Sequence, residues 1–211
     1  MRHPRLVLAT RNEHKVAELS RILEESGLGV DLVGVAAFDD VPNVAETGVT
    51  FADNALLKAH AVAVATGLPA VADDSGLCVD ALSGMPGVFS ARWSGRHGDD
   101  VANLELVLAQ LVDVADERRG AAFFCSAALA LPDGLERVAE GRWPGTLVRA
   151  PLGAGGFGYD PIFVPEGETR TSAQMSAAEK DAASHRGRAF RALVPVVAEL
   201  LAADRLGRSD G

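Results

Sequence analysis

Hydrophobic and polar positions change along the chain in blocks that predict strands and helices in turn. The short apolar run from Arg5 to Ala9 predicts a buried strand, and the apolar positions that follow recur at helical spacing until Gly27. A second strand is predicted from Val30 to Val35, and an alanine-rich helix from Phe51 to Ala65. This alternation of strands and helices favours an α/β fold.

The second half of the chain predicts that the sheet is mixed. Apolar positions from Val101 to Val112 predict a third helix. The segments Ala121–Leu131 and Leu135–Arg142 flank Pro132-Asp133-Gly134, a sequence typical of a hairpin turn. Trp143–Arg149 predicts another strand. We therefore expect an antiparallel pair within the sheet, so the fold is not purely doubly wound.

The C-terminal part is predicted to be helical. Ser176 and Glu179 fit the capping-box pattern, which marks the start of a helix. The segment Ser184–Gly187 interrupts it, and apolar positions from Phe190 to Leu201 define a last helix. Residues Arg205–Gly211 are predicted to form a frayed tail. No linker composition is visible, so residues 1–211 are predicted to form a single domain.

Composition and charge exclude several classes of function. The hydrophobic content of 48% is that of a globular protein, and the net charge of −9 argues against non-specific binding to nucleic acid or anionic membrane. Cys78 and Cys125 lie far apart in apolar surroundings, which favours core positions over a disulfide or a zinc site. There is neither an apolar stretch of about 18 residues nor a signal-peptide layout, so we expect a cytoplasmic location.

One stretch brings two carboxylates together directly after an apolar run. In Asp73-Asp74-Ser75-Gly76, adjacent aspartates on an extended chain point to opposite faces, so one enters a given pocket and the other can orient loops. We expect this stretch at the C-terminal end of a strand, where ligands of open α/β sheets bind, and Leu77-Cys78-Val79 either continues that strand or turns back. The alternative from this stretch alone is a turn in which the aspartates accept bonds from local N–H groups.

Two other stretches suit a nucleotide. Thr10–Lys15 is predicted as a strand-to-helix turn, where backbone N–H groups and Lys15 favour phosphate; simple capping by Thr10 or Asn12 is the alternative. In the glycine-rich segment that follows Pro151, the rings of Phe157 and Tyr159 are placed to flank a flat base. The alternative there is a turn with two core aromatics.

Five motifs in a fixed order closely resemble the inosine/xanthosine triphosphate pyrophosphatase family, over nearly the whole chain. They are Thr10-x-Asn12-x-x-Lys15, Glu46-Thr47-Gly48, Asp73-Asp74-Ser75-Gly76, Gly155-Gly156-Phe157-Gly158-Tyr159-Asp160-Pro161 and Ser184-His185-Arg186-Gly187. The resemblance implies a long mixed β-sheet flanked by helices, two lobes with the active cleft between them, and a homodimer. It also implies magnesium-dependent hydrolysis of ITP, dITP and XTP to the monophosphate and pyrophosphate, which cleanses the nucleotide pool.

The resemblance also implies residue roles. Asp74 is the base that activates water, and Glu46 and Asp74 hold magnesium. The residues expected to bind the phosphates are Thr10, Arg11, Asn12, Glu13, His14, Lys15 and Ser75. The residues expected to hold the purine base are Phe157, Gly158, Tyr159, Asp160, Lys180, His185 and Arg186. His14 departs from the family pattern, in which many members have a small residue before the lysine.

Elementary chemistry agrees with these roles. Carboxylates share a pocket with a polyphosphate only through a bridging cation, and magnesium prefers such oxygen ligands. No serine or cysteine nucleophile with a base partner is visible, which favours direct attack by water. The guanidinium of Arg186 offers only donors, which suit the 6-oxo group of hypoxanthine and xanthine and not the amino group of adenine.

Two other functions compete with this interpretation. A non-catalytic purine nucleotide sensor would use the same pocket, although a pure binder would avoid carboxylates beside the phosphates. A haloacid-dehalogenase-like phosphatase is disfavoured, because that family separates its two aspartates by one residue whereas Asp73 and Asp74 are adjacent.

Overall fold

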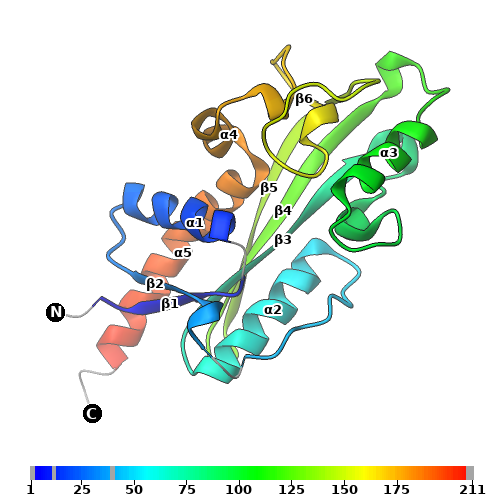
Figure 1. The fold of residues 1–211 in the computed structure, drawn as a ribbon. Coiled ribbons are helices and arrows are strands. Elements are labelled where there is room, and N and C mark those ends of the chain that lie inside the picture. Colours follow the sequence, from blue (N-terminus) through cyan, green and yellow to red (C-terminus); the bar gives the residue numbers. More distant parts are fainter. Residues whose placement is uncertain (1–2, 11–12, 39–40, 208–211) are drawn as a thin grey trace. The chain divides into compact units, whose positions relative to one another are not determined.

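A computed structural model describes residues 3–10, 13–38 and 41–207, and within these ranges six strands form one mixed sheet. The strand order is β2-β1-β3-β4-β5-β6 (Figure 1). The strand bounds are β1 Arg5–Leu8, β2 Asp31–Gly34, β3 Ala70–Val79, β4 Gly120–Ala130, β5 Glu136–Leu147 and β6 Phe163–Pro165. β1 pairs in parallel with β2 and with β3, whereas β5 pairs antiparallel with β6. The predicted mixed α/β sheet is confirmed.

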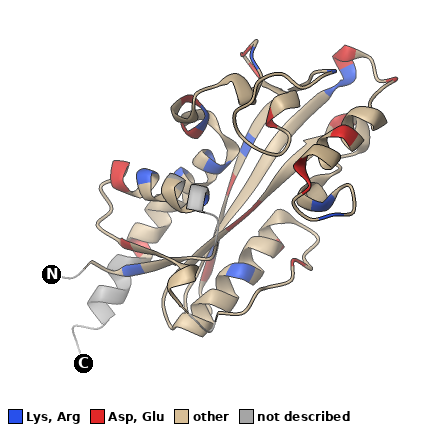
Figure 2. Ribbon diagram, in the orientation of Figure 1, with Lys and Arg blue, Asp and Glu red and all other residues tan. Residues whose placement is uncertain are grey.

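The chain divides into two compact units, which three of the strands share. Unit 1 comprises residues 1–74, 126–141 and 186–211, and unit 2 comprises residues 75–125 and 142–185. β3, β4 and β5 each contribute residues to both. Within the described ranges, no helix is long and apolar enough to cross a membrane. Acidic and basic positions are mixed over the ribbon in Figure 2 and form no basic stripe along the described elements.

Unit 1 is built around an alanine-rich helix. Its helices are α1 Glu13–Glu25, α2 Phe51–Thr66 and all but the first residue of α5 His185–Gly207. Thr50 caps α2 through a capping box with Asp53, and Gly67 ends it in the left-handed conformation at φ 66°. Ala55, Ala59 and other small residues on one face of α2 are buried in the unit's core. Their small volume lets the helix lie close to its neighbours, and the predicted helix is confirmed.

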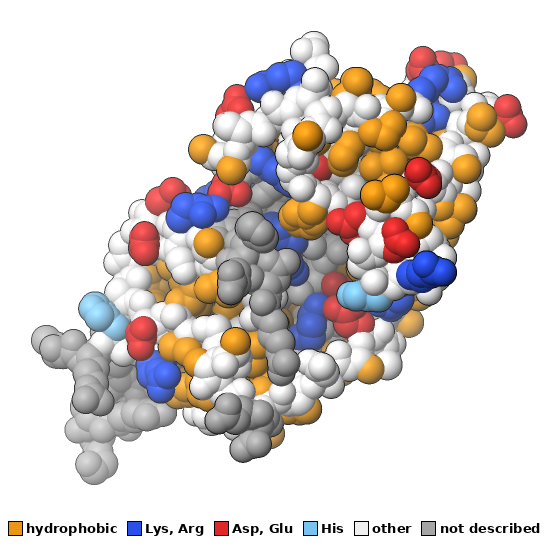
Figure 3. All heavy atoms as spheres, viewed as in Figure 1, with side chains coloured by type: hydrophobic (Ala, Val, Ile, Leu, Met, Phe, Trp, Pro, Cys, Tyr) orange, Lys and Arg blue, Asp and Glu red, His pale blue; other side chains and the backbone are white. Residues whose placement is uncertain are grey.

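Unit 2 has a larger and more aromatic core. Its helices are α3 Asp100–Gln110, which Asp99 caps, and α4 Ala177–Ala183, which Ser176 caps as predicted. Phe123, Trp143 and Phe163 pack together in the core, with ring centroids 4.7 and 5.5 Å apart for the two pairs that include Phe163. Figure 3 shows hydrophobic side chains gathered on the surface over α3 and the segments beside it.

Three sequence predictions need correction. β3 continues through Asp73 to Val79, so the paired aspartates lie inside the strand and not at its end, because their side chains are satisfied by partners without a turn. The segments 135–142 and 143–149 are largely one strand, β5, since no turn residue separates them. α5 continues to Gly207, so residues 205–207 are helical and not frayed, and residues 208–211 lie outside the described ranges.

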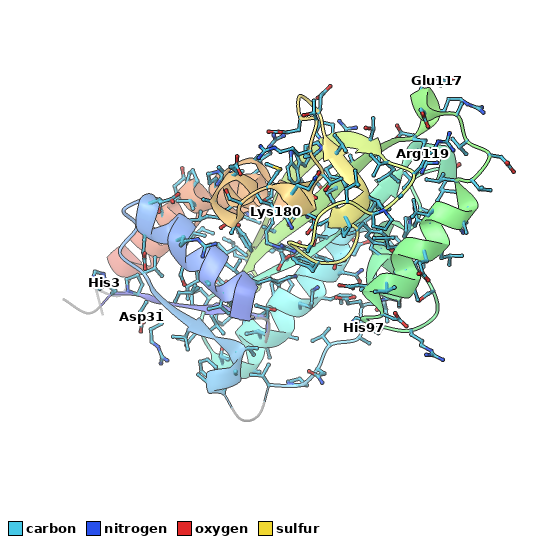
Figure 4. All side chains as sticks on the ribbon, turned by 45° about the horizontal axis from the view of Figure 1, so that its top comes forward. His3, Asp31, His97, Glu117, Arg119 and Lys180 are labelled. Atoms are coloured by element: carbon cyan, nitrogen blue, oxygen red, sulfur yellow. The ribbon has the colours of Figure 1, made fainter. Side chains whose placement is uncertain are left out.

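Arg119, labelled in Figure 4, is a buried cation whose guanidinium is bound by backbone carbonyl oxygens. Its guanidinium donates to the carbonyls of Leu111, Leu147 and Val148 at 2.8 to 3.0 Å. It thereby ties the C-terminal end of α3 to the end of β5.

We expect Arg119→Met to destabilise the protein by about 2 kcal/mol, because three carbonyls lose a charged donor in a buried setting. Urea unfolding at neutral pH measures the difference. Arg118→Met is the matched control, since the Arg118 side chain is exposed, and it should unfold with the wild type. Equal stability of the Arg119 and Arg118 variants would show that the three hydrogen bonds of Arg119 do not stabilise the folded protein.

Candidate functional site

Asp73 is held by two basic side chains in the middle of β3. Its side chain is 1% exposed and accepts from Lys15 Nζ at 2.9 and 3.0 Å and from Arg186 Nε at 3.1 Å. Lys15 comes from the first turns of α1, and Arg186 from the start of α5. Burial alone would raise the pKa of Asp73, but the charges of Lys15 and Arg186 outweigh it and hold this pKa well below its usual range. Asp73 is therefore ionised and committed to ion pairs.

Asp74, the next residue, has a separate set of partners on α2. Its carboxylate accepts from Asn54 Nδ2 at 3.1 Å and lies 3.4 Å from Lys58 Nζ. Burial raises the pKa of Asp74; Lys58 and Asn54 oppose this shift, and the charges of Glu46 and Asp73 add to it. The two neighbouring aspartates thus have opposite pKa shifts, as expected for side chains on opposite faces of a strand.

Glu46 and Asp74 lie around one cationic group. Lys58 Nζ lies 2.8 Å from Glu46 Oε1 as well as 3.4 Å from Asp74 Oδ1. The Gly48 N–H donates to Asn54 Oδ1 at 2.8 Å, which fixes the loop after Glu46 against α2. The two carboxylates that the family resemblance assigns to magnesium therefore both contact one cationic group.

Asn54 and Lys58 are site residues that the sequence reasoning missed. They are four residues apart on α2 and therefore share one face of the helix. Asn54 is fully buried within an otherwise alanine-rich face. A polar pair at this spacing beside small buried residues is the signal that would have identified them.

The donor set at Glu46 and Asp74 fits magnesium. Within the described part of the chain, no group of three or more His, Cys, Asp or Glu side chains is arranged to hold a metal. Magnesium usually takes one or two carboxylates and completes its shell with water and substrate phosphates. Two carboxylates that share a cation position meet that requirement, provided that the substrate supplies the remaining oxygens.

In unit 2, Asp160 organises the glycine-rich segment. Its buried carboxylate accepts from the backbone N–H of Phe157 at 2.8 Å, from Ser172 Oγ at 2.7 Å and from Lys180 Nζ. Lys180, labelled in Figure 4, extends from α4, and its ammonium lies 4.9 Å from the centroid of the Phe157 ring. At Gly156, with φ +72°, a β-carbon would collide with the Asp160 carboxylate, so this turn requires glycine.

The two aromatic residues of this segment have different environments. Phe157 is 56% exposed and presents its ring at the surface of unit 2. Tyr159 is buried in the core, and its hydroxyl donates to the carbonyl of Ser90 at 2.8 Å. Gly158 lies between them, and its N–H donates to Asp100 Oδ2 at 2.8 Å. Phe157 is therefore the ring available for stacking, and Tyr159 anchors the segment.

The motif that contains His185 and Arg186 contributes to both units. His185 belongs to unit 2, where its buried ring stacks on Phe123 with centroids 4.9 Å apart and an interplanar angle of 12°. Arg186 belongs to unit 1 and pairs with Asp73. The start of α5 therefore places one residue of the motif in each unit.

The structure describes only part of the first motif. Arg11 and Asn12 lie outside the described residues, and of Glu13 and His14 only the backbone at the start of α1 is described. Thr10 is half-buried, and its N–H donates to the carbonyl of Leu8 at 2.8 Å. Ser75 is likewise half-buried, within β3. The phosphate-binding role of these six residues and of Lys15 stays a prediction.

Comparison with known proteins gives one consistent result. Residues 6–196 match the model of the Ham1 family. The chain is 71% identical to a dITP/XTP pyrophosphatase of Streptomyces coelicolor over 197 residues, which is 93% of this chain and 98% of the relative. It is 61% identical to a dITP/XTP pyrophosphatase of Nocardia farcinica over 95% of this chain and 97% of the relative.

Solved structures agree with the sequence matches. A crystal structure of a nucleoside-triphosphatase, or dITP/XTP pyrophosphatase, from Mycobacterium abscessus superposes with a TM-score of 0.77 at 59% identity, covering 90% of this chain and 99% of that one. The structure of a HAM1 protein from Coxiella burnetii gives a TM-score of 0.86 at 41% identity, covering 93% of this chain and 99% of that one.

Proposed function

Since this chain belongs to the Ham1 family, we propose that it hydrolyses the non-standard purine nucleotides ITP, dITP and XTP to the monophosphate and pyrophosphate, with magnesium as cofactor. The identity of 71% to a dITP/XTP pyrophosphatase over 93% of the chain carries this proposal. The same reaction would remove these nucleotides from the pool before a polymerase incorporates them.

The chemical step is assigned to the carboxylates of unit 1. In this proposal Glu46 and Asp74 hold magnesium, which when bound neutralises phosphate charge and polarises water. The Asp74 carboxylate takes the proton of the attacking water. Asn54, which donates to Asp74 Oδ2 at 3.1 Å, orients that carboxylate. Lys15 and the rest of the first motif bind the phosphates, with Ser75 beside them.

Recognition of the purine is assigned to the glycine-rich segment and the start of α5. The exposed ring of Phe157 stacks on the base, while Asp160 and Lys180 hold the segment in place. The guanidinium of Arg186, which Asp73 fixes through Nε, donates to the 6-oxo group.

Product analysis tests the activity. With dITP and magnesium, the protein should release pyrophosphate and not orthophosphate, and excess EDTA should stop the reaction. dATP should be cleaved at least about tenfold more slowly. The amino group of adenine and the guanidinium of Arg186 are both donors, so they cannot pair and a buried polar group is left without a partner. Orthophosphate as the first product, or full activity in EDTA, would overturn the proposal.

We expect Phe157→Ala to raise the KM for dITP by about 5- to 150-fold, since stacking of an aromatic ring on a base contributes about 1–3 kcal/mol. Turnover at saturation should change much less, because Phe157 does not touch the phosphates in this proposal. Steady-state kinetics separates the two parameters. Phe157→Tyr keeps the ring and is the control; an unchanged KM in the alanine variant would remove Phe157 from the base site.

A homodimer is also proposed, as the family resemblance implies. Exposed hydrophobic side chains on unit 2, including Met85, Phe89 and Val101, support a surface that a second copy of the chain covers. Sedimentation velocity over a range of concentrations should give twice the chain mass of 22.0 kDa. A monomer at all concentrations would contradict the dimer and leave the activity proposal untouched.

A further inference from the structure

One lysine ammonium contacts both carboxylates that the proposed function assigns to a metal ion. Lys58 Nζ lies 2.8 Å from Glu46 Oε1 and 3.4 Å from Asp74 Oδ1. The three side chains are largely buried, with exposures of 18% for Lys58, 25% for Glu46 and 12% for Asp74. Water therefore screens the charges of this group only partly.

Two carboxylates that contact the same ammonium group need a cation beside them. Without one, their mutual repulsion and their burial would destabilise the ionised pair. Lys58 meets this need within the chain, and α2 holds it in place together with Asn54, which bonds both Asp74 and the loop after Glu46. A magnesium ion held by the same two carboxylates would lie near the ammonium, and the two cations would repel each other.

We propose that Lys58 is the resident counter-cation of the Glu46–Asp74 pair and that a metal ion binds by displacing it. This inference rests on the proposed function, because only there are Glu46 and Asp74 metal ligands. Lys58 lowers the affinity of the nucleotide-free protein for metal.

The displaced ammonium needs a new anionic partner. The lysine stem is flexible, so the ammonium can turn away from the carboxylates while its backbone stays on α2. The substrate phosphates are the anions that the reaction brings to this site. Metal therefore binds weakly to the free protein and tightly when the nucleotide arrives, which links the two binding steps.

Manganese binding without nucleotide tests the inference directly. Free Mn²⁺, followed by electron paramagnetic resonance, is titrated with wild type, Lys58→Gln and Lys58→Arg. We expect the glutamine variant to bind Mn²⁺ at least about tenfold more tightly than the wild type, since it removes one buried positive charge. The arginine variant keeps the charge and should bind no more tightly than the wild type. Equal affinity of the wild type and the glutamine variant, or no binding to either, overturns the inference.

Two further measurements separate this inference from the proposed function. Adding Glu46→Gln to the Lys58→Gln variant should abolish the gain in affinity; an unchanged gain would show that the metal binds elsewhere and would count against the proposed ligands. Thermal unfolding should show a lower melting temperature for Lys58→Gln without metal and a recovery with Mn²⁺ larger than in the wild type. Pyrophosphate release by the wild type tests the activity alone, whatever the titration gives.

Discussion

The Asp74→Asn variant is expected to fold like the wild type and to lose about 10³-fold in turnover of dITP, because a positioned general base typically contributes 10²–10⁴-fold. Asparagine has nearly the same shape and can still accept from Asn54 Nδ2 through its own carbonyl oxygen. It cannot take a proton from water, and it offers a weaker ligand to a hard cation. Both losses act on the chemical step.

Initial rates of pyrophosphate release at saturating dITP and magnesium measure this effect. Asp113→Asn is the matched control, since it removes an exposed carboxylate from unit 2 and should leave turnover unchanged. Circular dichroism checks that both variants fold. Turnover near the wild-type value in Asp74→Asn would remove Asp74 from the mechanism.

The second large effect concerns stability. Asp73→Ala should lower the free energy of unfolding by about 3–5 kcal/mol, the usual cost of removing one partner from a buried ion pair. The substitution leaves Arg186, whose side chain is 7% exposed, and Lys15 without the carboxylate that both contact. Urea unfolding at pH 7 measures the loss. Wild-type stability in this variant would show that the ion pairs do not hold β3 to α1 and α5.

The same residue predicts how stability depends on pH. The pKa of Asp73 is lower in the folded protein than in the unfolded chain, so its contribution is complete above the unfolded pKa of about 4. As the pH falls below that value, the unfolded chain binds a proton that the folded protein does not, and stability declines. Asp73→Asn carries no such proton, so the stability difference between it and the wild type should shrink between about pH 4 and pH 2.

Elements with local signals could be predicted from the sequence. The caps at Ser176 and Gly67 and the Pro132-Asp133-Gly134 turn involve residues close together in the chain, and the structure confirms each element that they bound. Local signals could not decide whether β3 continues past Asp74 or turns back. Asp73 is accommodated inside a strand because Lys15 and Arg186 neutralise it from 58 and 113 residues away.

In the candidate site, too, contacts between residues far apart in the sequence could not be predicted. The sequence places Phe157 and Tyr159 in one glycine-rich segment. Only the tertiary contact of Tyr159 with Ser90 decides which of the two rings is buried. Lys58 looks like an ordinary solvated lysine in the sequence. Its role depends on the loop that carries Glu46, which Asn54 fixes from the same helix face.

Asp73 and Asp74 are adjacent in one continuous strand. The roles proposed for them therefore depend on how β3 is aligned with its neighbouring strands. Side chains alternate between the two faces with a period of two, so sliding β3 by one residue would move each aspartate to the opposite face of the strand. A slide that carried Asp74 to the place of Asp73 would set its carboxylate beside Lys15 and Arg186 and take it away from Asn54 and Lys58. A one-residue insertion or deletion before Asp73 that shifted this alignment would therefore turn the carboxylate that we propose as the general base into a structural one, although both aspartates would still be present.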